Sequence, residues 1–398
     1  MSLASTPLEP TTLPTSTHAN ETLLGDTIRV LCLDGGGTRG VMEVTILEEI
    51  ERQTQKPISE SFDFIAGTSI GGILALGLSY ISPSTKKPYS AEELRGIFYK
   101  DGNRIFDQSW GWIRDIWNAW SAKYDSKGVE GVLKERFGDA LLTDIEKPVL
   151  VVAYDVTESA AYPFFSPVAN KKDQNFLLRD IGRATSAAPT YFPAAVIKLR
   201  ETDTTRTFVD GGLAANNPSV PAALAAMLLF NTNNIFVVSL GCGFSRASKG
   251  VDDNGGLIQW AGPTIDAMFA ANAQSSHRNM ESLAKRVDKV NGVNEPEKKY
   301  SCYKRFNVDL TPEEGERDLT ARLDDPSPAY LDKLVASVKA KYIDEKAPKF
   351  KKLKDAIKRL EKIGRDRTPE QEERIASAKW AYGIEPNVFN TDDNVLTF

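Results

Sequence analysis

A serine flanked by glycines lies where an apolar run gives way to a helical pattern. Residues 67–71 read Gly-Thr-Ser-Ile-Gly, directly after the apolar segment SFDFIAG (61–67). A G-x-S-x-G sequence between a strand and a helix is typical of a nucleophile elbow, in which a sharp turn exposes the serine Oγ. Gly67 and Gly71 leave room for that turn, so Ser69 is the candidate nucleophile for acyl transfer. The alternative is a serine that only caps the helix.

A serine nucleophile needs a base, and histidine is scarce in this chain. There are two histidines, His18 and His277. His18 lies in a stretch rich in Ser, Thr and Pro, and His277 lies within a helical pattern with no strand end nearby. Neither is well placed for a Ser–His–Asp arrangement, so we expect a hydrolase that works without histidine.

Three aspartates follow apolar runs and could supply the base instead. Asp34 begins a glycine-rich loop and is expected to brace it, whereas Asp155 leads into residues that would obstruct a substrate. Asp210 is followed by Gly211 and Gly212, which leave its carboxylate accessible. Asp210 is therefore the candidate base. An ordinary Asp, with a pKa of about 3.9, is a weak base at neutral pH. Either partial burial raises the pKa of Asp210, or the oxyanion donors lower more of the barrier.

The loop DGGGTRG (34–40) has more glycine than a tight turn requires. Gly35, Gly36, Gly37 and Gly40 can turn bare N–H groups toward an anion, and Arg39 adds a positive charge beside a helix N-terminus. The spacing also fits a dinucleotide-binding pattern, but the next strand lacks the acidic residue which that reading needs, and no GK[ST] follows. We expect the loop to stabilise developing negative charge.

Strands and helices that alternate along the chain must position these residues. Long apolar runs followed by helical patterns are typical of a sheet with both faces covered. The predicted fold is a three-layer α/β/α domain with a mainly parallel central sheet. The expected strands are residues 27–34, 61–67, 147–155, 206–212 and 233–243, with 303–310 as a candidate sixth strand.

Composition divides the chain into three parts: a flexible N-terminal arm (1–25), one α/β domain (26–344) and a basic helical extension (345–398). Residues 346–367 carry ten Lys and Arg against three Asp and Glu, with one narrow apolar stripe. This helix could cap the domain, contact anionic lipid or bind another partner. A capping pattern that begins at Thr368 predicts a second helix.

The composition also bounds the environment of the protein. The chain has 398 residues, a formal net charge of −5 and three widely spaced cysteines, which we interpret as reduced thiols and not as a metal site. No signal peptide or transmembrane segment is recognisable, so a cytoplasmic protein with peripheral membrane association is expected. Four tryptophans in the segment 108–124 could form a lid or interfacial anchor, or pack on the core.

Taken together, the motifs resemble the patatin-like phospholipase family. The resemblance covers roughly residues 27–310 and rests on DGGGTRG (34–40), GTSIG (67–71), ATSAAPTYFPA (184–194) and VDGGLAANNP (209–218). The chain resembles plant patatins and calcium-independent phospholipases A2 more than the calcium-dependent cytosolic type. The resemblance implies a membrane phospholipid substrate, no cofactor and no nucleic acid.

Applied to this chain, the resemblance assigns a role to each motif residue. Ser69 would be the nucleophile and Asp210 the base of a calcium-independent dyad. The Gly36 and Gly37 amides, helped by Arg39, would form the oxyanion hole. Two other classes remain open: a serine esterase, thioesterase or acyltransferase on non-lipid substrates, and a nucleotide- or lipid-binding module. A regulatory ligand or protein partner is also expected, without a residue that identifies it.

Overall fold

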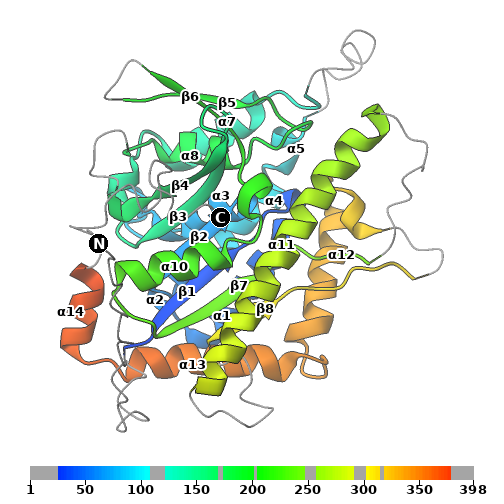
Figure 1. The fold of residues 1–398 in the computed structure, drawn as a ribbon. Coiled ribbons are helices and arrows are strands. Elements are labelled where there is room, and N and C mark those ends of the chain that lie inside the picture. The colour runs from blue at the N-terminus through cyan, green and yellow to red at the C-terminus, as the bar shows by residue number, and fades with distance from the viewer. Residues whose placement is uncertain are drawn as a thin grey trace, which may run out of the picture.

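A mixed β-sheet lies between two layers of helices in the computed structural model (Figure 1). The structure describes residues 26–107, 122–168, 174–200, 204–246, 257–290, 302–313 and 318–377. Three features expected from the sequence therefore lie outside the described residues: the N-terminal arm, most of the tryptophan-rich segment and the chain after residue 377.

The described residues form eight strands in one sheet. The strands are β1 (Ile28–Leu33), β2 (Phe64–Thr68), β3 (Val149–Asp155), β4 (Ala160–Phe165), β5 (Ala195–Lys198), β6 (Thr205–Asp210), β7 (Ile235–Leu240) and β8 (Tyr303–Phe306). The α-helices are α1 (Val41–Thr54), α2 (Ile58–Ser61), α3 (Ile70–Ser79), α4 (Ala91–Tyr99), α5 (Gly102–Ile105), α7 (Lys127–Phe137), α8 (Leu178–Thr185), α9 (Gly212–Ala215), α10 (Ser219–Leu229), α11 (Leu257–Val290), α12 (Pro328–Val338), α13 (Phe350–Arg365) and α14 (Pro369–Ser377).

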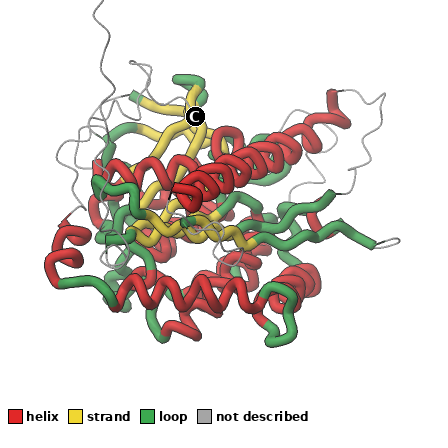
Figure 2. The backbone as a smooth tube through the Cα atoms, turned by 60° about the horizontal axis from the view of Figure 1, so that its bottom comes forward, coloured by secondary structure: helices red, strands yellow, loops and turns green. Residues whose placement is uncertain are grey.

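Side chains of the central strands alternate between two hydrophobic clusters. In β1, Leu31 and Leu33 point into one cluster while Val30 and Cys32 point into the other, as the two-residue period of a strand requires. Helices cover both faces of the sheet (Figure 2). The first face is covered by α1, α3, α4, α7, α8, α12 and α13, and the second by α10 and α11. Burial on both faces explains why β1 is apolar along its whole length.

The sheet is parallel at its centre and antiparallel at one side. The strand order is β5-β6-β3-β2-β1-β7-β8, with β4 also paired to β3. Strands β1, β2, β3, β7 and β8 are parallel, which confirms the mainly parallel α/β fold. Strands β4, β5 and β6 run antiparallel to their neighbours. The strand before Asp210 was predicted, but its reversed direction was not.

Two strands share one edge of β3. Strand β2 pairs with residues 149–152 of β3, and β6 pairs with residues 153–155, while β4 occupies the opposite edge. Since β2 is parallel to β3 and β6 is antiparallel to it, the carboxyl ends of β2 and β6 approach each other. Thr68 lies opposite Val152, and Asp210 lies opposite the next residue, Ala153. This register brings the ends of two distant segments to one point.

The basic helix predicted after residue 345 is α13, and its apolar stripe packs on the domain. Leu353, Ile357 and Leu360 are buried in the same cluster as α1. Thr368 and Gln371 exchange the expected capping hydrogen bonds, which confirms the start of α14. The apolar face of α13 is therefore explained by its packing on the domain, the first of the three roles considered for this basic helix.

A buried ion network attaches this C-terminal region to the sheet. The Arg367 guanidinium donates to both carboxylate oxygens of Asp63 and to the Thr27 carbonyl, while Arg29 also donates to Asp63. Burial alone would raise the pKa of Asp63, but hydrogen bonds from Arg367 and Arg29 hold it well below its usual range. Asp63 directly precedes β2, so the network fixes the start of the strand that leads into Ser69.

We expect Arg367→Ala to lower the free energy of unfolding by about 3 kcal/mol, because it removes one partner from a buried ion network. Urea denaturation followed by circular dichroism measures the effect. Arg374→Ala is the matched control, since Arg374 pairs with Asp26 while its side chain is 55% exposed. The control should cost less than about 1 kcal/mol. Equal losses in the two variants would contradict the proposed anchoring.

Candidate active site

Ser69 occupies a strained turn between β2 and α3. Its backbone angles are φ 56° and ψ −126°, in the positive-φ region that a residue with a side chain seldom adopts. Both flanking glycines are required sterically. A Cβ on Gly67 would lie 2.0 Å from the Gly71 carbonyl oxygen, and one on Gly71 would lie 2.4 Å from the Leu33 carbonyl oxygen. The elbow geometry expected from the sequence is therefore present.

A threonine from a distant segment holds this turn in place. The Ser69 amide donates to the Thr185 Oγ1 at 2.8 Å, and the Thr185 hydroxyl donates to the Val152 carbonyl at 2.6 Å. Thr185 ends α8 and is completely buried. Its hydroxyl thus connects the strained serine to the edge of β3. Sequence reasoning assigned no role to Thr185, although it lies in the motif ATSAAPTYFPA.

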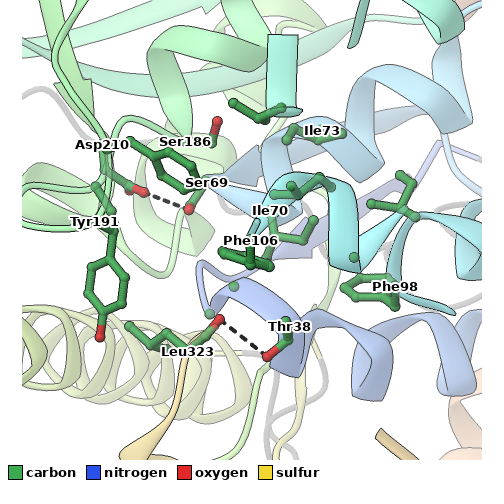
Figure 3. A pocket seen from close by; sticks show the side chains of 18 of the residues that line it. Thr38, Ser69, Ile70, Ile73, Phe98, Phe106, Ser186, Tyr191, Asp210 and Leu323 are labelled. Atoms are coloured by element: carbon green, nitrogen blue, oxygen red, sulfur yellow. Dashed lines mark hydrogen bonds between the residues drawn. The ribbon is translucent and has the colours of Figure 1, made fainter. Parts of the chain in front are cut away.

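The Ser69 hydroxyl donates to Asp210 Oδ2 at 2.6 Å (Figure 3). The other carboxylate oxygen of Asp210 accepts the Gly212 amide at 2.7 Å. A Cβ on Gly211 would lie 2.1 Å from the Val152 carbonyl oxygen, so the chain can pass β3 only with glycine there. The structure therefore brings Ser69 and Asp210 together, with Gly211 and Gly212 in supporting positions.

Burial makes Asp210 a stronger base than an ordinary aspartate. Its side chain is fully buried, and this burial raises its pKa to about 7, although hydrogen bonds from Ser69 and the Gly212 amide act in the opposite direction. A pKa near neutrality suits a group that must accept and return a proton. The raised proton affinity that the sequence argument considered has a physical source here.

The other candidate bases have different partners. Asp155 accepts from Arg206 at 2.7 Å and from the Thr157 amide at 2.8 Å. His277 lies on α11, where its Nδ1 is 3.1 Å from the Tyr303 hydroxyl. Neither side chain contacts Ser69 in the part of the chain that the structure describes. The preference for Asp210 over these two residues agrees with the geometry.

The glycine loop lies directly against the serine. A Cβ on Gly35 would lie 3.1 Å from the Ser69 Cβ, and Gly36 and Gly37 line the same cavity as Ser69. Among the described residues, no acceptor takes a hydrogen bond from the Gly36 or Gly37 amide. Two free amides beside a nucleophile can stabilise an oxyanion. Their role stays a prediction, which this arrangement supports.

Arg39 and Gly40 are the last two residues of the glycine loop. Arg39 is not among the residues that line the cavity, and its buried Nε has no hydrogen-bond partner in the described part of the chain. A direct contribution of its side chain to the oxyanion hole therefore stays a prediction. Gly40 packs against α3, where a Cβ would lie 2.9 Å from the Ile70 side chain.

Asp34 anchors the start of the glycine loop. Its carboxylate forms a buried, two-pronged ion pair with Arg305 of β8, and its amide donates to Glu43 Oε1 of α1 at 2.7 Å. The predicted bracing role of Asp34 thus has two partners that sequence reasoning missed. The available signal was a charged residue within an apolar pattern, since Arg305 lies in YKRF (303–306) and Glu43 in VMEVTIL (41–47).

An apolar cavity extends from the dyad between several helices. It encloses about 830 Å³, including space open to solvent. Its polar side chains are few and include Ser69, Asp210 and Ser186. The residues that line it are Gly36, Gly37, Thr38, Ser69, Ile70, Ile73, Ile97, Phe98, Gly102, Ile105, Phe106, Val129, Val132, Leu133, Ser186, Ala188, Tyr191, Phe192, Asp210, Phe269 and Leu323.

Two properties of the described residues concern metal binding and membrane crossing. No group of three or more His, Cys, Asp or Glu side chains there could hold a metal ion. None of the helices in the same residues has both the length and the apolar character needed to cross a bilayer.

We expect kcat/KM to fall below a pH of about 7, because only the ionised Asp210 can accept the serine proton. Initial rates with a soluble ester between pH 5 and 9 give this profile. A His277→Ala variant should show the same acidic limb. A limb that disappears with His277 would show that the histidine supplies the base.

The same pKa has a consequence for stability. The native Asp210 binds a proton below about pH 7, whereas an unfolded Asp binds one only below about pH 4, so stability declines as the pH rises through this window. Asp210→Asn removes that dependence and keeps the side chain's shape. The wild type should therefore lose melting temperature relative to this variant between pH 5 and pH 8. A constant difference would contradict the raised pKa.

Comparisons with known proteins concern the family of the chain. A family model described as patatin-like phospholipase matches residues 31–223. Patatin-like protein 2 of Oryza sativa subsp. indica is 30% identical over 285 residues, which cover 62% of this chain and 70% of that protein. A cGAMP-activated phospholipase of Pseudomonas aeruginosa is 33% identical over 265 residues, covering 63% and 73%.

Two further similarities were found, one to a relative over a shorter stretch and one to a solved structure. A cGAMP-activated phospholipase of Escherichia coli is 36% identical over 204 residues, which cover 48% of this chain and 54% of that protein. The solved structure of VipD from Legionella pneumophila aligns with 89% of this chain and 73% of that chain, at a TM-score of 0.42 and 12% identity. On the family match and the two relatives covered beyond two thirds, this chain belongs to the patatin-like phospholipase family of lipid acyl hydrolases.

Proposed function

We propose that the protein hydrolyses fatty acyl esters of phospholipids or other glycerolipids, with Ser69 as nucleophile and Asp210 as its base. The observation that carries the proposal is the 2.6 Å hydrogen bond from the Ser69 hydroxyl to Asp210 at one end of an apolar cavity. The cavity suits a fatty acyl chain, because burial of methylene groups there is favourable.

In the first half-reaction, Ser69 Oγ attacks the ester carbonyl carbon while its proton passes to Asp210 Oδ2. The carbonyl oxygen becomes an oxyanion, and the free amides of Gly36 and Gly37 donate hydrogen bonds to it. Collapse of this intermediate breaks the ester C–O bond. The departing alcohol takes the proton from Asp210, and the acyl group remains on Ser69.

The second half-reaction repeats these steps with water. Asp210 accepts a proton from a water molecule, whose oxygen attacks the acyl-enzyme carbonyl carbon. The intermediate then expels Ser69 Oγ, which recovers the proton from Asp210, and a fatty acid leaves. Each proton transfer and each stabilising contact in this scheme uses a group of the chain itself. We therefore propose that hydrolysis does not require calcium.

Replacement of the nucleophile tests the chemistry directly. We expect a fluorophosphonate probe to label the wild type and to leave Ser69→Ala unlabelled. Lipid mass spectrometry after incubation with mixed phospholipid vesicles should show Ser69-dependent release of fatty acid, with the same rate in EDTA. Asp210→Asn should lose at least about a hundredfold in rate, since general-base catalysis contributes on this scale.

Asp155→Asn is the matched control for the base, because Asp155 is equally buried at a strand end but pairs with Arg206. The fluorophosphonate probe should still label Asp155→Asn. Labelling of Ser69→Ala would refute the assigned nucleophile. Hydrolysis confined to short soluble esters or thioesters would favour a non-lipid serine hydrolase, and transfer to an added alcohol would favour an acyltransferase. Unchanged lipid binding by Ser69→Ala without any hydrolysis would favour a binding module.

We also propose that a ligand controls this activity, and that the protein hydrolyses phospholipid at a membrane surface. The support is the similarity to the cGAMP-activated phospholipases of Pseudomonas aeruginosa and Escherichia coli.

We expect cGAMP to raise the rate of fatty acid release from vesicles by at least about fivefold, as a coupling free energy of 1–3 kcal/mol implies. Ser69→Ala with cGAMP is the control for contaminating lipases. A rate that is the same at every cGAMP concentration would contradict activation by this ligand.

A further inference from the structure

The apolar cavity has a reactive end, at Ser69 and Asp210, and a part lined by apolar side chains. Ser69, Asp210 and Ser186 lie together at one side of the close-up, while Phe98 lies at the other side beyond Ile70 and Phe106 (Figure 3). An acyl chain whose carbonyl carbon is attacked by Ser69 must therefore extend toward Phe98. This step rests on the proposed lipid acyl hydrolase function.

Phe98 is fixed at this end by its neighbours. The ring is 3% exposed, and its Cζ would lie 3.1 Å from a Cβ built on Gly40. The same Cβ would lie 2.9 Å from Ile70, the residue that follows the nucleophile. The tip of the Phe98 ring thus packs against the last glycine of the glycine loop, close to Ile70, and its burial restricts how far it can move aside for a longer chain.

Side chains of α4 and α7 form another part of the apolar lining. Ile97, Val129, Val132 and Leu133 line the cavity, and each is no more than 3% exposed. They present no polar group to a ligand. A methyl terminus fits this surface, whereas a charged or hydrated group would lose its solvation there.

We propose that Phe98, with the α7 wall opposite, sets the maximum length of the acyl chain that the site accepts. Below this limit each added methylene is buried in the cavity, which is worth about fourfold in kcat/KM. Above it the chain meets the ring, and the gain is lost. Phe98 is a specificity-determining residue, since it contacts the substrate chain and takes no part in the bond-breaking steps.

The test measures kcat/KM for p-nitrophenyl esters from four to sixteen carbons, with cGAMP present throughout. Phe98→Ala removes the six ring carbons and leaves a cavity. The optimum should move to longer chains by about three to four carbons, since the vacated space can bury that many methylene groups. Val132→Phe adds a ring to the opposite wall and should move the optimum to shorter chains.

Leu94→Ala is the matched control, because Leu94 is fully buried on the same helix but does not line the cavity. It should lower stability comparably and leave the chain-length optimum unchanged. The position of the optimum does not depend on the fraction of protein that is folded. Instability therefore cannot imitate the expected shift.

The outcomes separate this proposal from the function on which it rests. Ser69-dependent hydrolysis with the same optimum in Phe98→Ala and Leu94→Ala would overturn the role of Phe98 alone. Failure of the wild type to hydrolyse any ester in a Ser69-dependent manner would overturn the proposed function. A longer optimum in Phe98→Ala and a shorter one in Val132→Phe would establish the chain-length limit.

Discussion

The site depends on the way two strands share one edge of β3. Strand β2 reaches Val152 from one direction, and β6 reaches Ala153 from the other, so their carboxyl ends meet. Ser69 and Asp210 are the residues at this junction, although 141 positions separate them. Backbone pairing fixes the register of the strands to a single residue, and this register places Ser69 beside Asp210.

This placement requires two arrangements that are unfavourable for folding. Ser69 adopts a positive φ, and Asp210 is an acid buried without a cationic partner among its hydrogen bonds. Both arrangements are useful for chemistry, since one exposes the Oγ and the other raises the proton affinity of the carboxylate. The surrounding structure supplies the compensation, through the Thr185 hydroxyl at the turn and the Gly212 amide at the acid.

Local sequence was enough to predict the elbow, the glycine loop and the preference for Asp210 over histidine. Each depends on residues that are close in the chain, such as the glycines around Ser69 and after Asp210. The antiparallel direction of β6 was not predictable, because strand direction depends on pairing across the sheet. Arg305 and Thr185 were missed for the same reason, since their partners lie 271 and 116 residues away. The segment 108–121 lies outside the described residues.

Chemistry and chain recognition therefore reside on different elements. The reactive groups belong to β2, β6 and the glycine loop, which the sheet register holds in place. In the proposed arrangement the acyl chain lies against α4 and α7, which pack on one face of that sheet. Substitutions in these helices can change the shape of the cavity without altering the hydrogen bond between Ser69 and Asp210. In this architecture acyl-chain preference can vary while the catalytic geometry stays constant.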